Sequence, residues 1–248
     1  MPGRLTGKIA IVTGATSGIG KATAEQLAAQ GARVAVVGRN REAGEDVVSA
    51  INGRHGAATA IFIAADLARP ADAAAVVQQT VEAWGRVDIL VSNAAVMTFK
   101  PVIELEEADW DLVQNVNLKA AFLLAKHAIP HMSEGGAIVN VSSVHAIATS
   151  PLAVPYAASK GGLEAFTRGL AVEMKPRGIR VNAVRLGAID TPMLWDNPNV
   201  KSGAEQVDST MVGRPEDVAA TISFLAGPGA AFITGTVLDV DGGRLAHL

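Results

Sequence analysis

The chain has 248 residues, a net charge of −3 at pH 7 and no cysteine. It can therefore form no disulfide, no thiolate metal site and no cysteine nucleophile, and without a block of lysine or arginine neither nucleic acid nor an anionic membrane is an expected partner. Hydrophobic residues make up 49% of the chain but aromatic residues only 4%, so the core must be built from Ala, Val, Ile and Leu, as in helices packed on a buried parallel sheet.

Strand-like apolar runs recur along the chain, and helix-patterned stretches such as "PADAAAVVQQTVEAWG" separate most of them. This alternation predicts right-handed crossovers and a parallel sheet covered by helices on both faces. We expect an α/β fold of the Rossmann type, a doubly wound parallel sheet of about seven strands in a single domain that spans 1–248. The expected strands are 8–12, 32–37, 60–64, 87–91, 137–141, 179–184 and 236–240.

The sequence contains no obvious targeting segment. No apolar run approaches the ~18 to 20 residues that a membrane-spanning helix needs. The opening "MPGRLTGK" lacks the apolar stretch of a secretory signal peptide. We therefore expect a cytoplasmic protein without a membrane partner, whose ligand is a small molecule.

The glycine-rich segment "TGATSGIG" (13–20) follows the first expected strand directly and contains Gly14, Gly18 and Gly20. A turn of this kind lets the backbone approach a pyrophosphate, whose charge is stabilised by the N-terminus of the following helix. The spacing G-x-x-x-G-x-G differs from the commonest dinucleotide fingerprint, so the loop alone fits an ordinary tight turn equally well.

One long polar segment, about 187–215, interrupts the alternation of strands and helices and is rich in Pro, Gly and Asn. Loops of this length inside compact domains are usually functional or disordered. Its large apolar residues Leu194 and Trp195 favour a substrate lid, and both are expected in the substrate pocket.

Further motifs follow the glycine loop in this order: "ADL" (65–67), "SNAAV" (92–96), "NVNLKAAF", "NVSS" and "YAASK". Together they resemble the classical short-chain dehydrogenases/reductases over essentially the whole chain. Two residues depart from that pattern, since Ala95 stands where the family usually has Gly and Leu186 where it usually has Pro. The resemblance implies a nicotinamide cofactor held by Gly14, Ser17, Gly18, Ile19, Gly20, Arg39, Asp66, Leu67, Asn93, Ala94, Tyr156, Lys160, Gly187, Ile189 and Thr191.

Tyr156 is the only tyrosine and precedes Lys160 by four residues in a helix-patterned stretch, so both side chains project from one face. A phenol titrates near pH ~10, and a neighbouring ammonium lowers its pKa, an effect to which a bound oxidised nicotinamide would add. The pair predicts that Tyr156 is the general acid in carbonyl reduction and the general base in alcohol oxidation. Taken alone, Y-x-x-x-K also fits a solvated helix pair.

The resemblance implies two further catalytic residues. The hydroxyl of Ser143 would bind the substrate oxygen as charge builds there, and Ser142 should point elsewhere because side chains alternate along a strand. Asn117 would hold a water that links Lys160 to solvent, although a helix Asn that caps or faces water is the alternative.

His145 lies close to Ser143 in the sequence, which raises the alternative of a hydrolase. A nucleophilic serine needs an oriented base and usually a sharp elbow, and neither is visible here. His145 is either a substrate-pocket residue or a plain loop histidine. The other histidines lack the spacing of metal ligands, so no metal site is expected.

The end of the second expected strand bears on the choice of coenzyme. An acidic residue there binds the adenosine ribose in many dinucleotide folds, whereas an Arg nearby binds a 2′-phosphate. This chain has Gly38 followed by Arg39, which favours NADP(H) with NAD(H) as the alternative. Ser17 stands where many NADP-dependent relatives carry a second basic residue, which weakens that preference.

These features predict an oxidoreductase that moves a hydride between a nicotinamide cofactor and a ketone or secondary alcohol. A regulatory or scaffold protein that binds the cofactor without turnover is the alternative. The apolar "SPLAVP" and "MLW" favour a cyclic or aliphatic ketone, while sugar and 3-oxoacyl substrates remain open. By the same resemblance, helices at 106–131 and 155–176 imply a homotetramer.

Overall fold

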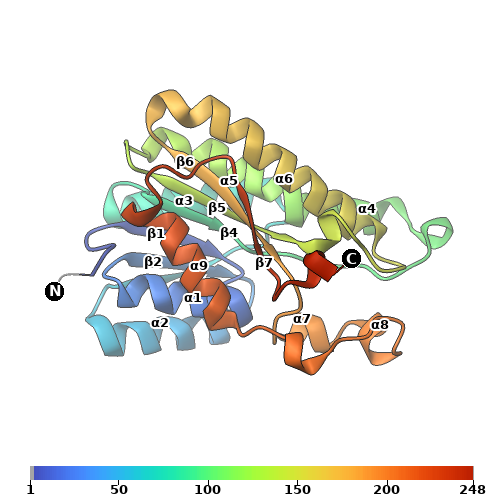
Figure 1. Cartoon of the computed structure of the whole chain (residues 1–248). Coiled ribbons are helices and arrows are strands. Elements are labelled where there is room, and N and C mark those ends of the chain that lie inside the picture. The colour runs from blue at the N-terminus through green and yellow to red at the C-terminus, as the bar shows by residue number, and fades with distance from the viewer. Residues whose placement is uncertain (1–2, 248) are drawn as a thin grey trace.

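The computed structural model describes residues 3–247, so Met1, Pro2 and Leu248 of the expected domain lie outside the described residues. Its centre is one parallel sheet in the strand order β3-β2-β1-β4-β5-β6-β7 (Figure 1). This confirms the predicted doubly wound, Rossmann-type fold. The strands are β1 Ile9–Thr13, β2 Arg33–Gly38, β3 Ala60–Ala64, β4 Ile89–Ser92, β5 Ala137–Ser143, β6 Arg180–Leu186 and β7 Val237–Val240.

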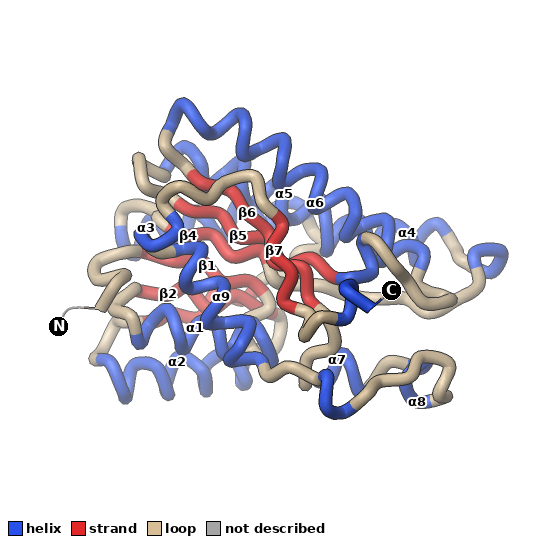
Figure 2. Tube along the Cα trace, viewed as in Figure 1, coloured by secondary structure: helices blue, strands red, loops and turns tan. Residues whose placement is uncertain are grey.

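Helices cover both faces of this sheet, as Figure 2 shows. One face carries α1, α2 and α9, and the other carries α3, α5 and α6. The helices are α1 Gly18–Ala29, α2 Arg41–His55, α3 Pro70–Trp84, α4 Glu107–Gln114, α5 Ala120–Ala128, α6 Val154–Met174, α7 Pro192–Trp195, α8 Pro198–Lys201 and α9 Pro215–Ala226. No helix of the described residues is long and apolar enough to cross a membrane.

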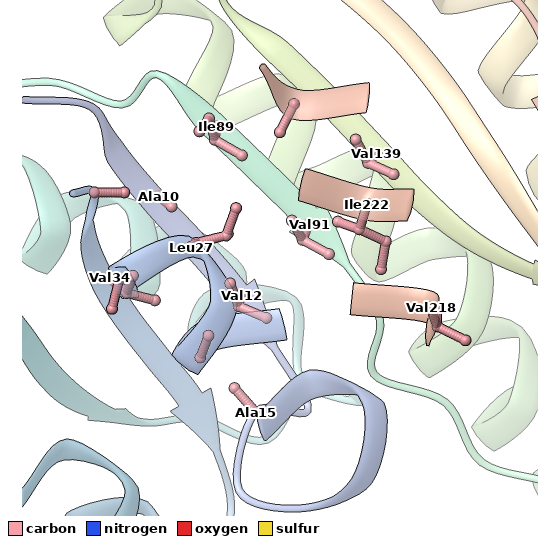
Figure 3. Packing of buried hydrophobic residues seen from close by; sticks show 14 of the residues in the cluster. Ala10, Val12, Ala15, Leu27, Val34, Ile89, Val91, Val139, Val218 and Ile222 are labelled. Carbon is pink, nitrogen blue, oxygen red and sulfur yellow. The ribbon is translucent and has the colours of Figure 1, made fainter. Parts of the chain in front are cut away.

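Side chains along each strand point alternately to the two faces of the sheet, so the core consists of two apolar layers. In β1, Val12 belongs to the layer under α1 and α9, while Ile11 belongs to the layer under α3 and α5. Figure 3 shows Val12, Leu27 of α1 and Ile222 of α9 in the first layer. Burying one such Leu or Ile side chain contributes roughly 1.5–3 kcal/mol. All seven strands are parallel, so their carboxyl ends lie together at one edge of this packed sheet.

Strand order reverses between β1 and β4, which are neighbours in the sheet although β2 and β3 lie between them in the chain. The carboxyl edge at such a reversal is where doubly wound sheets bind their ligands. The segment 187–215 starts at this edge, after β6, and contains α7, α8 and the short turn Ser209–Met211. Figure 1 shows α7 and α8 outside the layers of the domain.

Candidate active site

A cavity of about 700 Å³ lies at the carboxyl edge of the sheet. It draws its walls from the loop after β1, the ends of β2 to β6, helix α6 and the segment after β6. The residues expected from the sequence that line it are Gly14, Ser17, Gly18, Ile19, Arg39, Asp66, Leu67, Asn93, Ala94, Ser143, His145, Tyr156, Lys160, Gly187, Ile189, Thr191 and Leu194. Gly20, Asn117 and Trp195 are not part of its wall.

The glycine loop has the form of a cradle for a phosphate group. Gly14 and Gly18 adopt φ values of +63° and +49°, a region that favours glycine. A Cβ on Gly20 would lie 2.1 Å from the carbonyl oxygen of Gly14. Ser17 precedes α1 without capping it through its side chain, and the first turn of α1 holds no acidic residue. These residues fit the pyrophosphate of a dinucleotide.

Gly20→Ala is expected to disrupt this cradle, because the new methyl group would overlap the Gly14 carbonyl. Overpacking of this kind costs about 1–3 kcal/mol, and here it displaces the loop itself. We expect weaker nicotinamide cofactor binding by titration calorimetry and a lower melting temperature. Gly53→Ala is the matched control, since a Cβ there meets nothing within 4 Å. Unchanged cofactor affinity in Gly20→Ala would contradict the cradle.

Thr13 and Asn93 join the glycine loop to the end of β4. The hydroxyl of Thr13 accepts hydrogen bonds from the backbone N–H groups of Asn93 (3.0 Å) and Ala94 (3.1 Å). The side-chain amide of Asn93 donates to the carbonyl of Thr13 at 2.9 Å. Asn93 thus lines the cavity and also fixes the loop. Thr13 was not expected as a site residue from the sequence, although it is the first residue of the motif "TGATSGIG".

The side of the cavity formed by the ends of β2 and β3 holds Arg39 and Asp66. Arg39 is exposed beside Gly38, and a Cβ on Gly38 would lie 2.5 Å from the methyl carbon of Thr16. A carboxylate at position 38 would therefore require Thr16 to move. Asp66 is half-buried, and its carboxylate accepts from the backbone N–H of Ala68 at 3.1 Å.

Tyr156 and Lys160 project from one face of α6 and are both buried. The ammonium of Lys160 donates to the carbonyl of Val141 at 2.7 Å and lies 5.4 Å from the ring centroid of Tyr156. Burial lowers the pKa of Lys160 to about 8. Burial raises the pKa of Tyr156 to about 12, and a hydrogen bond with Ser143 offsets this rise only in part. The net direction of the pKa of Tyr156 is opposite to the one expected from its lysine neighbour, because burial disfavours the charged phenolate.

The two serines at the end of β5 separate as alternation predicts. Ser143 lines the cavity, and its hydroxyl accepts from the backbone N–H of His145 at 3.3 Å. The hydroxyl of Ser142 donates to Glu164 of α6 at 2.9 Å. Glu164 in turn forms an ion pair with Arg185 of β6 at 2.8 Å. Ser142 also borders the cavity, but its hydroxyl is held in this buried network.

Asn117 lies in a π-helical turn, Asn115–Lys119, which joins α4 to α5. Its side-chain oxygen accepts from the N–H of Val96 at 2.8 Å, and its amide donates to the carbonyl of Val96 at 2.9 Å and to the hydroxyl of Ser159 at 3.1 Å. Asn117 thus fixes the chain after β4 against α6. The water relay expected of it stays a prediction.

The far end of the cavity is lined by the segment after β6. Leu194 belongs to its wall together with His145, whose ring lies edge-on to Tyr156 with the centroids 5.5 Å apart. Trp195, expected in the same pocket, is 44% exposed, and its indole donates to Asp190 at 2.7 Å. In the described part of the chain no three His, Asp or Glu side chains come together as metal ligands.

Comparison with known proteins identifies the family. The family model described as enoyl-(acyl carrier protein) reductase matches residues 14–244. The chain is 38% identical to the 3-oxoacyl-(acyl-carrier-protein) reductase of Thermotoga maritima, an alignment that covers 97% of this chain and 98% of that protein. The chain belongs to the short-chain dehydrogenase/reductase family.

Two further relatives agree with this assignment. The cis-4-hydroxycyclohexanecarboxylate dehydrogenase of Sinomonas cyclohexanicum is 40% identical over 96% of this chain and 97% of its own length. The crystal structure of a short-chain dehydrogenase from Burkholderia cenocepacia J2315 in complex with NADP is 38% identical. It superposes with a TM-score of 0.90 over 96% of this chain and 98% of that chain.

This short-chain dehydrogenase/reductase is an NAD(P)-dependent oxidoreductase that transfers a hydride between its cofactor and a ketone or secondary alcohol. Asn117, Ser143, Tyr156 and Lys160 are all present, so a regulatory or scaffold protein without turnover is not favoured. Of the two departures from the family pattern, Ala95 lines the cavity and Leu186 is buried at its wall.

Several polar residues of the short-chain dehydrogenase/reductase cavity were missed in the sequence, and three of them lie in its last quarter. Asn197, Glu205 and Arg244 all line the cavity. Asn197 and Glu205 lie within the segment 187–215, and Arg244 follows β7. None belongs to a motif, so only the fold could bring them to the site.

Proposed function

We propose that this chain is an NADP(H)-preferring alcohol dehydrogenase or carbonyl reductase of the cytoplasm, which acts on small ketones and secondary alcohols. The observation that carries the proposal is that Ser143, Tyr156 and the buried Lys160 line one cavity with the glycine loop. This arrangement brings a substrate carbonyl and a cofactor to one place.

In reduction, Ser143 binds the substrate oxygen through its hydroxyl and stabilises the charge that develops there. Tyr156 donates its proton to that oxygen, and in oxidation it accepts the proton back. When bound, the nicotinamide supplies or accepts the hydride. Lys160 stabilises the phenolate that Tyr156 leaves behind and, with a water held near Asn117, returns a proton to it.

The panel that tests this function contains cyclic ketones, aliphatic ketones, β-keto esters and an aldose. Each is assayed with NADPH and with NADH by following nicotinamide absorbance, beside a Tyr156→Phe control. Turnover that depends on Tyr156 supports the reductase. Cofactor binding without turnover of any member would count against it and favour the regulatory alternative.

The preference for NADP(H) rests on Arg39, which is exposed at the cavity wall beside a glycine where a carboxylate side chain would require Thr16 to move. A guanidinium there can pair with a 2′-phosphate. Arg39→Ala is expected to lower kcat/KM for NADPH about 10- to 100-fold, the equivalent of one lost charge-assisted hydrogen bond, with little effect for NADH. Initial rates at equal coenzyme concentrations measure this.

Arg41→Ala is the matched control for that experiment. Arg41 is also an exposed arginine, two residues further on, but it pairs with Glu45 of its own helix at 3.1 Å and does not line the cavity. Its removal should leave both coenzymes unaffected. Equal or better turnover of the parent protein with NADH would refute the NADP(H) preference.

The segment 187–215 is proposed as the substrate lid. The amide of Asn199 in α8 donates to the carbonyl of Pro151 at 2.8 Å, which ties the segment to the loop after Ser143. A Cβ on Gly18 would lie 3.1 Å from the methyl carbon of Thr191, so the same segment also reaches the glycine loop. It therefore covers both the cofactor end and the substrate end of the cavity.

A homotetramer is proposed from the family resemblance and from apolar side chains on the surface of α4, α5 and α6. Trp110, Phe122 and Val172 are 40%, 45% and 77% exposed. Burying them between subunits would remove apolar surface from water. We expect light scattering to give four times the mass of one chain. The mass of a single chain would contradict this assembly.

A further inference from the structure

Glu205 of the proposed lid is an acidic residue buried at the substrate end of the cavity. It is 8% exposed, and its backbone N–H donates to the carbonyl of Asn199 at 2.9 Å, so the main chain holds it in place. One carboxylate oxygen, Oε1, accepts from the guanidinium of Arg244 at 3.0 Å. The other, Oε2, is buried and has no hydrogen-bond partner among the described residues.

An unsatisfied carboxylate oxygen is costly to bury, and a ligand that donates a hydrogen bond would remove that cost. Glu205 and Arg244 both line the cavity, so the donor can come from a substrate. Arg244 balances the charge of Glu205. Glu205 thus brings to the cavity wall an unsatisfied acceptor oxygen within a nearly neutral pair, which suits a neutral hydroxyl better than a carboxylate.

His145 lines the same cavity and offers a second acceptor. Its Nδ1 lies 2.8 Å from the hydroxyl of Thr149, a contact that either tautomer of the ring can make. In the tautomer with its proton on Nδ1, Nε2 is the acceptor. Burial lowers the pKa of His145, while Glu205 raises it and Arg244 lowers it, so both charged groups lie near this ring.

We propose that Glu205, oriented by Arg244, recognises a second hydroxyl group on the substrate, at a distance from the carbonyl or carbinol that reacts. This inference rests on the proposed function and specifies its substrate class as hydroxylated cyclic or aliphatic ketones and the matching diols. Met193, Leu194, Met97 and Val144 supply the apolar remainder of the wall. The substrate thus has an apolar skeleton that carries one further donor.

The test compares cyclohexanone with its 2-, 3- and 4-hydroxy derivatives under saturating NADPH. The quantity measured is the ratio of kcat/KM for the best hydroxy ketone to kcat/KM for cyclohexanone. A site built to bind a hydroxyl discriminates strongly against analogues that lack it, so we expect a ratio of at least about 10 in the parent protein. The corresponding amino ketone is assayed in parallel.

Glu205→Gln is the decisive variant, because Arg244 will hold the amide oxygen and turn the amide N–H₂ toward the cavity. The charged acceptor becomes a neutral donor without a change of shape, so the hydroxyl loses its charge-assisted hydrogen bond and the ratio should fall severalfold. Glu205→Asp keeps the charge but withdraws it by one methylene, and should also lower the ratio. The matched control is Glu216→Gln, an exposed residue in the first turn of α9.

A second readout is independent of turnover. Titration calorimetry of the best hydroxy ketone into the Tyr156→Phe protein with bound cofactor should show weaker binding when Glu205→Gln is added. Turnover of cyclohexanone and its derivatives at equal efficiency, or a ratio that Glu205→Gln and Glu205→Asp do not change, would overturn the hydroxyl subsite while the reductase stands. A stronger preference for the amino ketone would also overturn it. If no ketone of the wider panel is turned over, the proposed function fails and this inference fails with it.

Discussion

Tyr156→Phe is expected to abolish turnover while nearly preserving cofactor binding. The substitution removes the one phenolic hydroxyl that lines the cavity and leaves the ring that packs edge-on against His145. General acid–base catalysis by a positioned side chain is worth about a hundredfold to ten-thousandfold, so a loss of about a thousandfold in kcat is the expected size. Initial rates with the best ketone of the panel measure it.

Two measurements show whether the loss of turnover comes from the missing hydroxyl or from lost cofactor binding or unfolding. Titration calorimetry should give a dissociation constant for the coenzyme within about threefold of the parent value, a difference below 1 kcal/mol. Thermal unfolding should show that the variant is folded. A variant that keeps full activity would refute the role of general acid and base assigned to Tyr156, although Ser143 and Lys160 are still present in it.

Lys160→Met is expected to change how stability depends on pH. Burial lowers the pKa of Lys160 from 10.5 to about 8, so between these values the unfolded chain binds more protons than the folded protein. The free energy of unfolding of the parent protein therefore rises as the pH rises through this window, and this contribution is lost as the pH falls through 8. A methionine carries no such charge, so the variant lacks this dependence.

The free energy of unfolding of Lys160→Met minus that of the parent protein should consequently be about 2–3 kcal/mol larger at pH 7 than at pH 10. Urea unfolding at the two pH values measures this difference. Measurements stop at pH 10 because Tyr156, whose pKa is raised to about 12, lowers the free energy of unfolding as the pH rises further. Lys126→Met, at an exposed position of α5, should show no such change. Equal differences at both pH values would mean that Lys160 titrates as in water.

The fold could be predicted because its cause is local and periodic. Each strand is a short aliphatic run, and each long helix carries apolar residues at helical spacing, so "KIAIV" and "PADAAAVVQQTVEAWG" already specify a covered parallel sheet. The carboxyl ends of the strands then place Gly14, Asn93 and Ser143 at one edge. The spacing of Tyr156 and Lys160, four residues apart on one helix, places both side chains on the same face.

What could not be predicted depends on contacts between segments far apart in the chain. Glu205 and Arg244 are 39 residues apart, in segments without a motif, and meet only because the segment 187–215 and the segment after β7 share one cavity wall. The pKa of Tyr156 depends on how deeply α6 buries it, which spacing does not reveal. Trp195 looked like a pocket residue because it is large and apolar, but its indole is turned to Asp190.

Because the sheet is strictly parallel, the cavity and the turns that lead into the strands lie at opposite edges of it. Every described strand ends at the catalytic edge, so the turn between α2 and β3 lies at the opposite edge. Ala57 is exposed in that turn, and the natural chain has no cysteine. An Ala57→Cys variant would therefore carry a single thiol far from the cavity, through which the enzyme could be immobilised on a solid support or labelled with a dye while its entrance stays open.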